Sequence, residues 1–265
     1  MKHTAFLNII VLALLVPVLG FSHAEGGTAV EVRIISDVGG EFPRYRTYPH
    51  TGTDGEYFYV EAVKGGKYSI EVANRSDRRV AVVIAVDGRN IISGEKSYLK
   101  NSERMYLIEP YATNTFEGWR TGMTRTNRFF FTGQSNSYAR KVFSDASAMG
   151  TIAVAAYREK LHEATPVTPS DDSMSRSQGA GGKDCAERRN RNYNGEQAGT
   201  GFGETTYSPA REVPFEPEDL AAGMVVLKYE WREELCRKGI VSCGPGNRFW
   251  PDDIGFAPIP DDFRD

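Results

Sequence analysis

The sequence VAVVIAVDGRN, residues 80–90, joins seven apolar residues to the pair Asp87-Gly88. A short run that is apolar on both faces is typical of a strand buried inside a sheet. Asp-Gly also accepts the positive φ angles that a two-residue β-hairpin turn requires. We therefore expect residues 80–86 to form a central strand that turns at Asp87-Gly88 toward Ile91-Ile92.

On both sides of this run, apolar and polar residues alternate with a period of two, which indicates half-buried strands. The clearest of these segments are 30–35, 57–62 and 68–73, and later ones are 105–109, 115–119, 128–131 and 151–157. Gly65-Gly66 separates two of them and favours a hairpin at that place. About eight or nine short strands without a convincing helix predict an all-β fold, an antiparallel β-sandwich.

The period-two pattern stops near residue 160, so we place the sandwich at residues 25–160. Residues 161–222 are rich in Gly, Ser and Pro, and between 168 and 203 they contain scarcely an aliphatic side chain. Such a segment buries too little apolar surface to offset the entropy of ordering. It is expected to be a largely disordered linker.

Residues 223–265 are expected to form a small C-terminal strand-helix element with an acidic tail. Met224–Tyr229 is apolar enough for a strand, and Trp231–Lys238 has the apolar spacing of a short helix. Gly239 is suited to end that helix because glycine accepts a left-handed conformation.

The first 24 residues have the pattern of a secretory signal peptide. Met1-Lys2-His3 is basic, residues 5–19 are almost entirely apolar, and Ser22-His23-Ala24 resembles a cleavage site. The apolar core of about 15 residues is shorter than the roughly 20 that span a bilayer. We therefore expect an exported protein, periplasmic or extracellular, with no transmembrane anchor in the mature chain. A retained anchor is the alternative.

Export places the three cysteines in an oxidising compartment, where a close pair forms a disulfide. Cys236 and Cys243 are the better pair because only six residues separate them. Two free thiols are the alternative, since spacing alone does not fix the geometry of a disulfide. Cys185 stays free or joins another chain.

The chain has 265 residues and a formal net charge of −3, so nucleic acid is not an expected partner. No cofactor and no metal site are predicted. His162-Glu163 begins like the zinc-protease pattern H-E-x-x-H, but Pro166 stands at the position of the second histidine. No motif assigns a catalytic residue.

Two groups of aromatic residues have polar or basic neighbours, an arrangement that can stack on sugars or anchor a partner protein. They consist of Tyr45, Tyr48, Tyr57 and Tyr59, and of Trp119 with Arg120. These six residues are the candidate contacts for a ligand or partner. The alternative is that the rings fill the core of the sandwich, which needs several large side chains.

Several segments resemble a family of uncharacterised exported bacterial proteins. They are RRVAVVIAVDGRNIISGE (78–95), IEPYATNTFEGWR (108–120), GTIAVAAYREK (150–160), GTGFGE (199–204), EVPFEPE (212–218) and a final Gly239-Ile240. The resemblance covers most of the mature chain and implies export. It carries over no catalytic residue, because the family has no assigned reaction or ligand. Phe202 stands where the family pattern has His.

The leading hypothesis is a non-enzymatic envelope or secreted protein whose sandwich binds an envelope protein or a glycan. One alternative is a hydrolase of envelope polymers that uses a carboxylate pair including Glu117. Another is an assembly subunit, in which the strand at Met224–Tyr229 completes the sheet of its own or a neighbouring molecule. The identity of the partner and the oligomeric state are left open.

Overall fold

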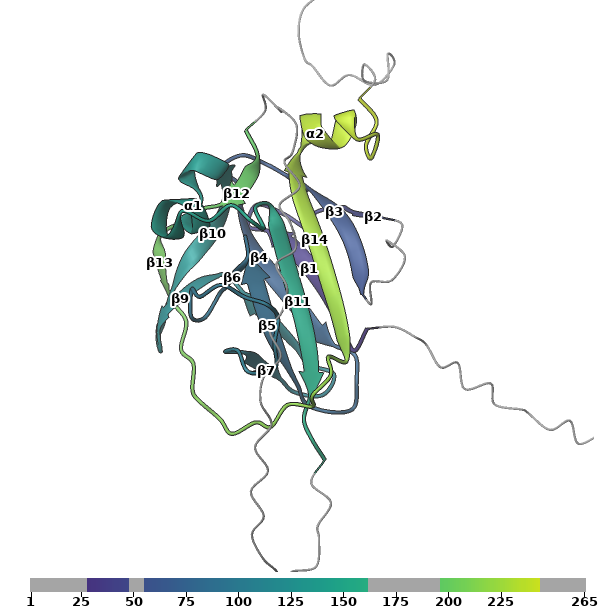
Figure 1. The fold of residues 1–265 in the computed structure, drawn as a ribbon, viewed down its shortest axis with the longest axis vertical. Coiled ribbons are helices and arrows are strands. Elements are labelled where there is room, and N and C mark those ends of the chain that lie inside the picture. The colour runs from purple at the N-terminus through teal and green to yellow at the C-terminus, as the bar shows by residue number, and fades with distance from the viewer. Residues whose placement is uncertain (1–27, 48–54, 162–195, 244–265) are drawn as a thin grey trace, which may run out of the picture.

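A computed structural model describes residues 28–47, 55–161 and 196–243. It confirms the all-β prediction: two seven-stranded sheets pack face to face (Figure 1). The helices of this part are the 3-10 turn η1 (Gln134–Asn136), α1 (Tyr138–Phe143) and α2 (Arg232–Arg237). Neither α1 nor α2, with six residues each, approaches the length of a membrane-spanning helix.

The first sheet has the order β1-β4-β10-β12, with β8 beside β4 and with β9 and β13 beside β10. Its strands are β1 (Val30–Ser36), β4 (Lys67–Asn74), β8 (Thr113–Phe116), β9 (Gly118–Gly122), β10 (Arg125–Gly133), β12 (Ala198–Thr200) and β13 (Thr205–Tyr207). All of its neighbouring strands are antiparallel.

The second sheet has the order β2-β3-β14-β11-β5-β6, with β7 beside β5. Its strands are β2 (Arg44–Arg46), β3 (Glu56–Ala62), β5 (Val80–Val86), β6 (Arg89–Asn90), β7 (Tyr106–Ile108), β11 (Thr151–Arg158) and β14 (Gly223–Trp231). The pairing of β3 with β14 is parallel, so the sandwich is not purely antiparallel.

The expectation for residues 80–90 is confirmed. Every residue of β5 is buried, and Val86 pairs with Arg89 across the turn. Asp87 and Gly88 have φ angles of 49° and 78°, the two positive values that this hairpin requires. One face of β5 lies in the main core, and on the other face Val83 packs against Leu99 and Met105.

The prediction of a hairpin at Gly65-Gly66 is wrong. The strands that it joins, β3 and β4, lie in different sheets, and the amide of Gly65 donates to the carbonyl of Phe131. The turn is a crossover between the sheets. Two glycines permit both kinds of turn, and the choice depends on pairing with strands that are distant in the sequence.

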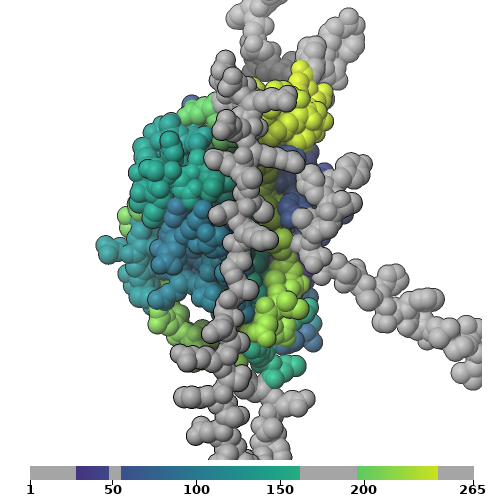
Figure 2. All heavy atoms as spheres, in the orientation of Figure 1, coloured from purple at the N-terminus to yellow at the C-terminus, as the bar shows by residue number. Residues whose placement is uncertain are grey.

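Residues 196–243 belong to the sandwich itself. Residues 198–207 supply β12 and β13, although they lay within the expected linker, and β14 is inserted between β3 and β11. The space-filling view shows residues 196–243, coloured green to yellow, packed against the middle of the chain (Figure 2). The C-terminal strand therefore completes the sheet of its own molecule, and both of its edges are paired.

The last described residues agree with the sequence. The expected helix forms as α2, and Gly239, with φ of 70°, follows it while the amide of Ile240 donates to the carbonyl of Leu235. Cys236 and Cys243 form a disulfide, with their Cα atoms 5.4 Å apart. Cys185 lies outside the described residues. Helix α1 is not predicted by the sequence pattern; it is short and is capped by Ser137, whose side chain accepts from the amide of Arg140.

A buried polar network joins the two sheets. The carboxylate of Asp87 accepts three hydrogen bonds, from the Tyr229 hydroxyl at 2.6 Å, the Gly150 amide at 2.8 Å and the Thr200 amide at 2.7 Å. The Thr200 hydroxyl lies 2.7 Å from the hydroxyls of both Tyr229 and Tyr68. Burial raises the pKa of Asp87 from its ordinary value of 3.8 to about 6, and the three hydrogen bonds limit that rise.

Candidate functional site

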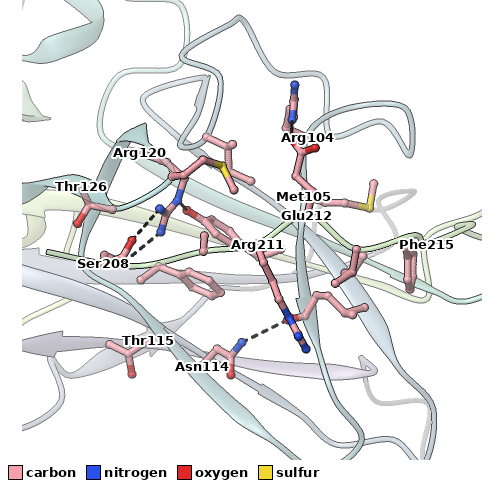
Figure 3. A pocket seen from close by; sticks show the side chains of 18 of the residues that line it. Arg104, Met105, Asn114, Thr115, Arg120, Thr126, Ser208, Arg211, Glu212 and Phe215 are labelled. Carbon is pink, nitrogen blue, oxygen red and sulfur yellow. Dashed lines mark hydrogen bonds and ion pairs between the residues drawn. The ribbon is translucent and has the colours of Figure 1, made fainter.

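A groove of about 960 Å³ lies at one end of the sandwich, between strands β7, β8 and β9 on one side and residues 208–217 on the other (Figure 3). We call it the β7–β8 groove and call residues 208–217 the strap. The groove has the size of a typical small-molecule site. In Figure 1 the strap runs along the outside of the molecule from β13 toward the start of β14.

The composition of the strap explains its extended form. Pro209, Pro214 and Pro217 remove three backbone donors and prevent both a helix and a regular strand. Hydrogen bonds fix both ends of the segment to the body: the amide of Ala210 donates to the carbonyl of Met123, and the amide of Lys160 donates to the carbonyl of Glu216. The strap therefore spans the end of the sandwich without entering a sheet.

The floor of the groove is aromatic. The rings of Tyr106 and Phe116, which come from different sheets, lie 4.5 Å apart. Arg120 ties this floor to the strap, because its Nε donates to the Tyr106 hydroxyl at 2.6 Å and its Nη atoms donate to the carbonyl and hydroxyl of Ser208 at 3.0 and 3.1 Å. Burial raises the pKa of Tyr106, and the Arg120 contact opposes that rise. Arg120 thus lines the groove, as a residue that positions the strap.

Charges of both signs line the groove in equal number. They are Arg79, Arg104, Arg120 and Arg211 against Glu103, Glu109, Glu117 and Glu212. Arg104 and Glu212 form an ion pair at 2.9 Å that gives the strap a further attachment. Arg211 is exposed and makes no hydrogen bond or ion pair with any residue that the structure describes. It is the cation in the groove that is available to a ligand.

Glu117, the acid named for the hydrolase alternative, lies at the edge of the groove and pairs with Arg128 at 2.9 Å. Arg128 also pairs with Asp37. No histidine or cysteine lines the groove. Within residues 28–47, 55–161 and 196–243, no group of three or more His, Cys, Asp or Glu could hold a metal ion.

Three of the predicted aromatic contacts come together on the outer face of the second sheet. Tyr45 on β2 lies opposite Tyr59 on β3, and Tyr57 lies two residues before Tyr59 on the same face. Their hydroxyls have no hydrogen-bond partner in the described part of the chain. Lys238 lies 5.2 Å from the centre of the Tyr59 ring. These tyrosines are separate from the groove, and Tyr48 lies outside the described residues.

Trp119 is a core residue and not a surface contact. It is 2% exposed and packs against Phe129 with ring centres 5.3 Å apart. Its indole N–H donates to the carbonyl of Gly201 at 3.0 Å. The sequence gives no sign of this partner, because Gly201 lies in the segment expected to be a linker.

The groove could not be predicted from the sequence. Its floor comes from β7 and β8, which belong to different sheets, and its outer wall comes from a segment that is about 100 residues later in the chain. The one local signal was the set of three prolines within residues 209–217, which excludes regular structure there. Comparison of the chain with protein-family models, with curated proteins and with solved structures finds no match.

Proposed function

We propose that this chain is an exported, non-enzymatic binding module of the cell envelope or of the secreted fraction, and that its ligand occupies the β7–β8 groove. The observation that carries the proposal is the groove itself: about 960 Å³ between two sheets and a strap that is attached at both ends. A preformed concave site with aromatic and polar walls is the usual form of a ligand site.

The walls favour binding over catalysis. Arg120 is held by its bonds to Tyr106 and Ser208, so this wall is organised before a ligand arrives. A preformed site saves the entropy of ordering side chains on binding. The groove offers donors, acceptors and apolar surface, and Glu117, the acid named for the hydrolase alternative, is paired with Arg128.

Export rests on two features. The first 24 residues have the charge and hydropathy pattern of a signal peptide. The Cys236–Cys243 disulfide is of a kind that persists in oxidising compartments.

The test is retention of a component from an envelope extract by the immobilised mature protein and by the variant Thr115→Trp. Thr115 is an exposed residue of β8 that lines the groove, so a large ring there obstructs the site without entering the core. Lys141→Trp on α1 is the matched control, because it adds the same ring at an exposed position outside the groove.

We expect the wild-type protein and Lys141→Trp to retain the same component and Thr115→Trp to lose it. Equal retention by all three proteins would place the ligand elsewhere on the molecule. Turnover of an envelope polymer, with no component retained, would replace the binding role by an enzymatic one.

A further inference from the structure

We infer that the β7–β8 groove binds a neutral oligosaccharide, an inference that rests on the proposed function and adds the chemical class of the ligand.

The charge of the groove argues against charged polymers. Four arginines and four glutamates line it, and the glutamates would repel an anionic chain as the arginines would repel a cationic one. Only Arg211 among the arginines is exposed and without a partner in the described chain. A single guanidinium provides directed hydrogen bonds to hydroxyl oxygens. An anionic polymer is usually bound by a surface that carries many positive side chains.

The backbone of the groove is poorly suited to a polypeptide ligand. A peptide that adds to a sheet needs a continuous row of free N–H and C=O groups. The Asn114 side chain already donates to the carbonyl of Leu107 on the edge of β7, at 3.3 Å. On the opposite wall, Pro209, Pro214 and Pro217 interrupt the donors of the strap. A ligand in this groove would therefore be bound mainly by side chains and not by backbone hydrogen bonds.

The side chains that remain match the two surfaces of a pyranose ring. Sugar rings present apolar C–H faces that pack on aromatic rings and a rim of hydroxyls that both donate and accept. Phe215 from the strap and the partly exposed Tyr106, whose ring is backed by the buried Phe116, supply apolar surface, and Met123, 50% exposed, extends it.

The polar partners for the sugar rim come from both walls. Thr113 and Thr115 are exposed residues of β8 that line the groove, and Arg211 lies on the strap. Figure 3 shows Thr115 and Asn114 on one wall and Arg211 and Phe215 on the other. A chain of sugars in the groove would thus meet the uncharged polar residues of β8 on one side and a guanidinium with an aromatic ring on the other.

The experiment is isothermal titration calorimetry of the mature protein with three probes: the neutral hexasaccharides of glucose and of N-acetylglucosamine, and the anionic hexasaccharide of galacturonate. The variants are Arg211→Ala and Thr115→Trp. Arg125→Ala is the matched control for the arginine, because Arg125 is likewise exposed and without a described partner but does not line the groove. Lys141→Trp is the control for the added ring.

We expect at least one neutral hexasaccharide to bind. Arg211→Ala should raise its Kd about tenfold, since a hydrogen bond from a charged donor is lost. Thr115→Trp should abolish the binding heat, and both control variants should stay within about twofold of wild type.

The inference is overturned if neither neutral probe binds, if galacturonate binds more tightly than both, or if Thr115→Trp leaves neutral binding intact. Its failure is distinguishable from that of the proposed function. A polypeptide retained from the envelope extract by wild type and lost in Thr115→Trp would sustain the binding module and exclude the oligosaccharide. If no neutral hexasaccharide binds and Thr115→Trp changes no retention from the extract, the groove is not a ligand site.

Discussion

Replacing Asp87 by Asn tests the buried network that joins the two sheets. The carboxylate accepts from Tyr229, Gly150 and Thr200. When it binds a proton it can donate to Tyr229, because the hydroxyls of Tyr229, Thr200 and Tyr68 can each reverse the direction in which they donate. An asparagine has no such option, since in either orientation its amino group faces the backbone N–H of Gly150 or of Thr200.

The expected effect depends on pH. The pKa of Asp87 is about 6 in the fold against an ordinary value of 3.8. Because the folded-state pKa is the higher one, the stability gained by protonation is fully present below about pH 4 and is lost as the pH rises through about 6. The interval between the two pKa values corresponds to about 3 kcal/mol. The difference in free energy of unfolding between wild type and Asp87→Asn should therefore widen by about 2–2.5 kcal/mol from pH 7.5 to pH 4, where the carboxyl of the unfolded chain is itself partly protonated.

The assay is urea unfolding followed by tryptophan fluorescence at a series of pH values, with both proteins measured in the same buffers. Groups that titrate equally in the two proteins cancel in the difference. Asp145→Asn is a control in which the stability difference should change with pH in the opposite direction. Burial alone would raise the pKa of Asp145, but hydrogen bonds from Ser147 and the charge of Arg89 bring that pKa below 3.8. The difference in free energy of unfolding between wild type and Asp145→Asn should therefore narrow on acidification. If the difference in free energy of unfolding between wild type and Asp87→Asn stays constant or narrows on acidification, the pKa of Asp87 is not raised by folding.

Three further changes test the packing and the loops. Glu103→Gln should cost about 1–2 kcal/mol at pH 7, because Glu103 accepts from the amides of Tyr98 and Lys100 and from the Ser97 hydroxyl. These bonds outweigh burial and lower the pKa of Glu103 below 4.5, so the cost should shrink as the pH falls below that value; a cost that is equal at pH 7 and pH 3 in urea unfolding would contradict this. Trp119→Ala should lower the free energy of unfolding by about 3–5 kcal/mol in the same assay, and a loss below about 1 kcal/mol would mean that the indole is not a core side chain. Replacing both Cys236 and Cys243 by Ser should cost about 2 kcal/mol, because the disulfide closes a short loop, and an unchanged melting curve in calorimetry would exclude a stabilising bridge.

Features set by neighbouring residues could be predicted from the sequence. The strand at 80–86, its turn at Asp87-Gly88, the glycine end of α2 and the cysteine pair each depend on residues within one short segment. Their physical causes are the apolar period, the positive φ angles and the short loop between the two thiols.

Features set by distant pairing could not be predicted in this way. The turn at Gly65-Gly66 crosses between sheets because β3 pairs with β14. The alternation of apolar and polar residues identifies a strand but does not say which strand it pairs with. Trp119 and Tyr59 look equally suited to a ligand in the sequence. They differ because a carbonyl from the supposed linker satisfies the indole and buries it, while the Tyr59 hydroxyl has no bond in the described chain.

The parallel pairing of β3 with β14 has a consequence for biogenesis. A chain that is synthesised or translocated from its N-terminus presents β3 and β11 first, each with one edge open, and supplies β14 only after residues 159–222. Open strand edges recruit other chains, and pairing across so long an interval is slow. We expect the nascent protein to need shielding from self-association until residue 231 has emerged, so a premature stop before residue 223 should yield aggregates.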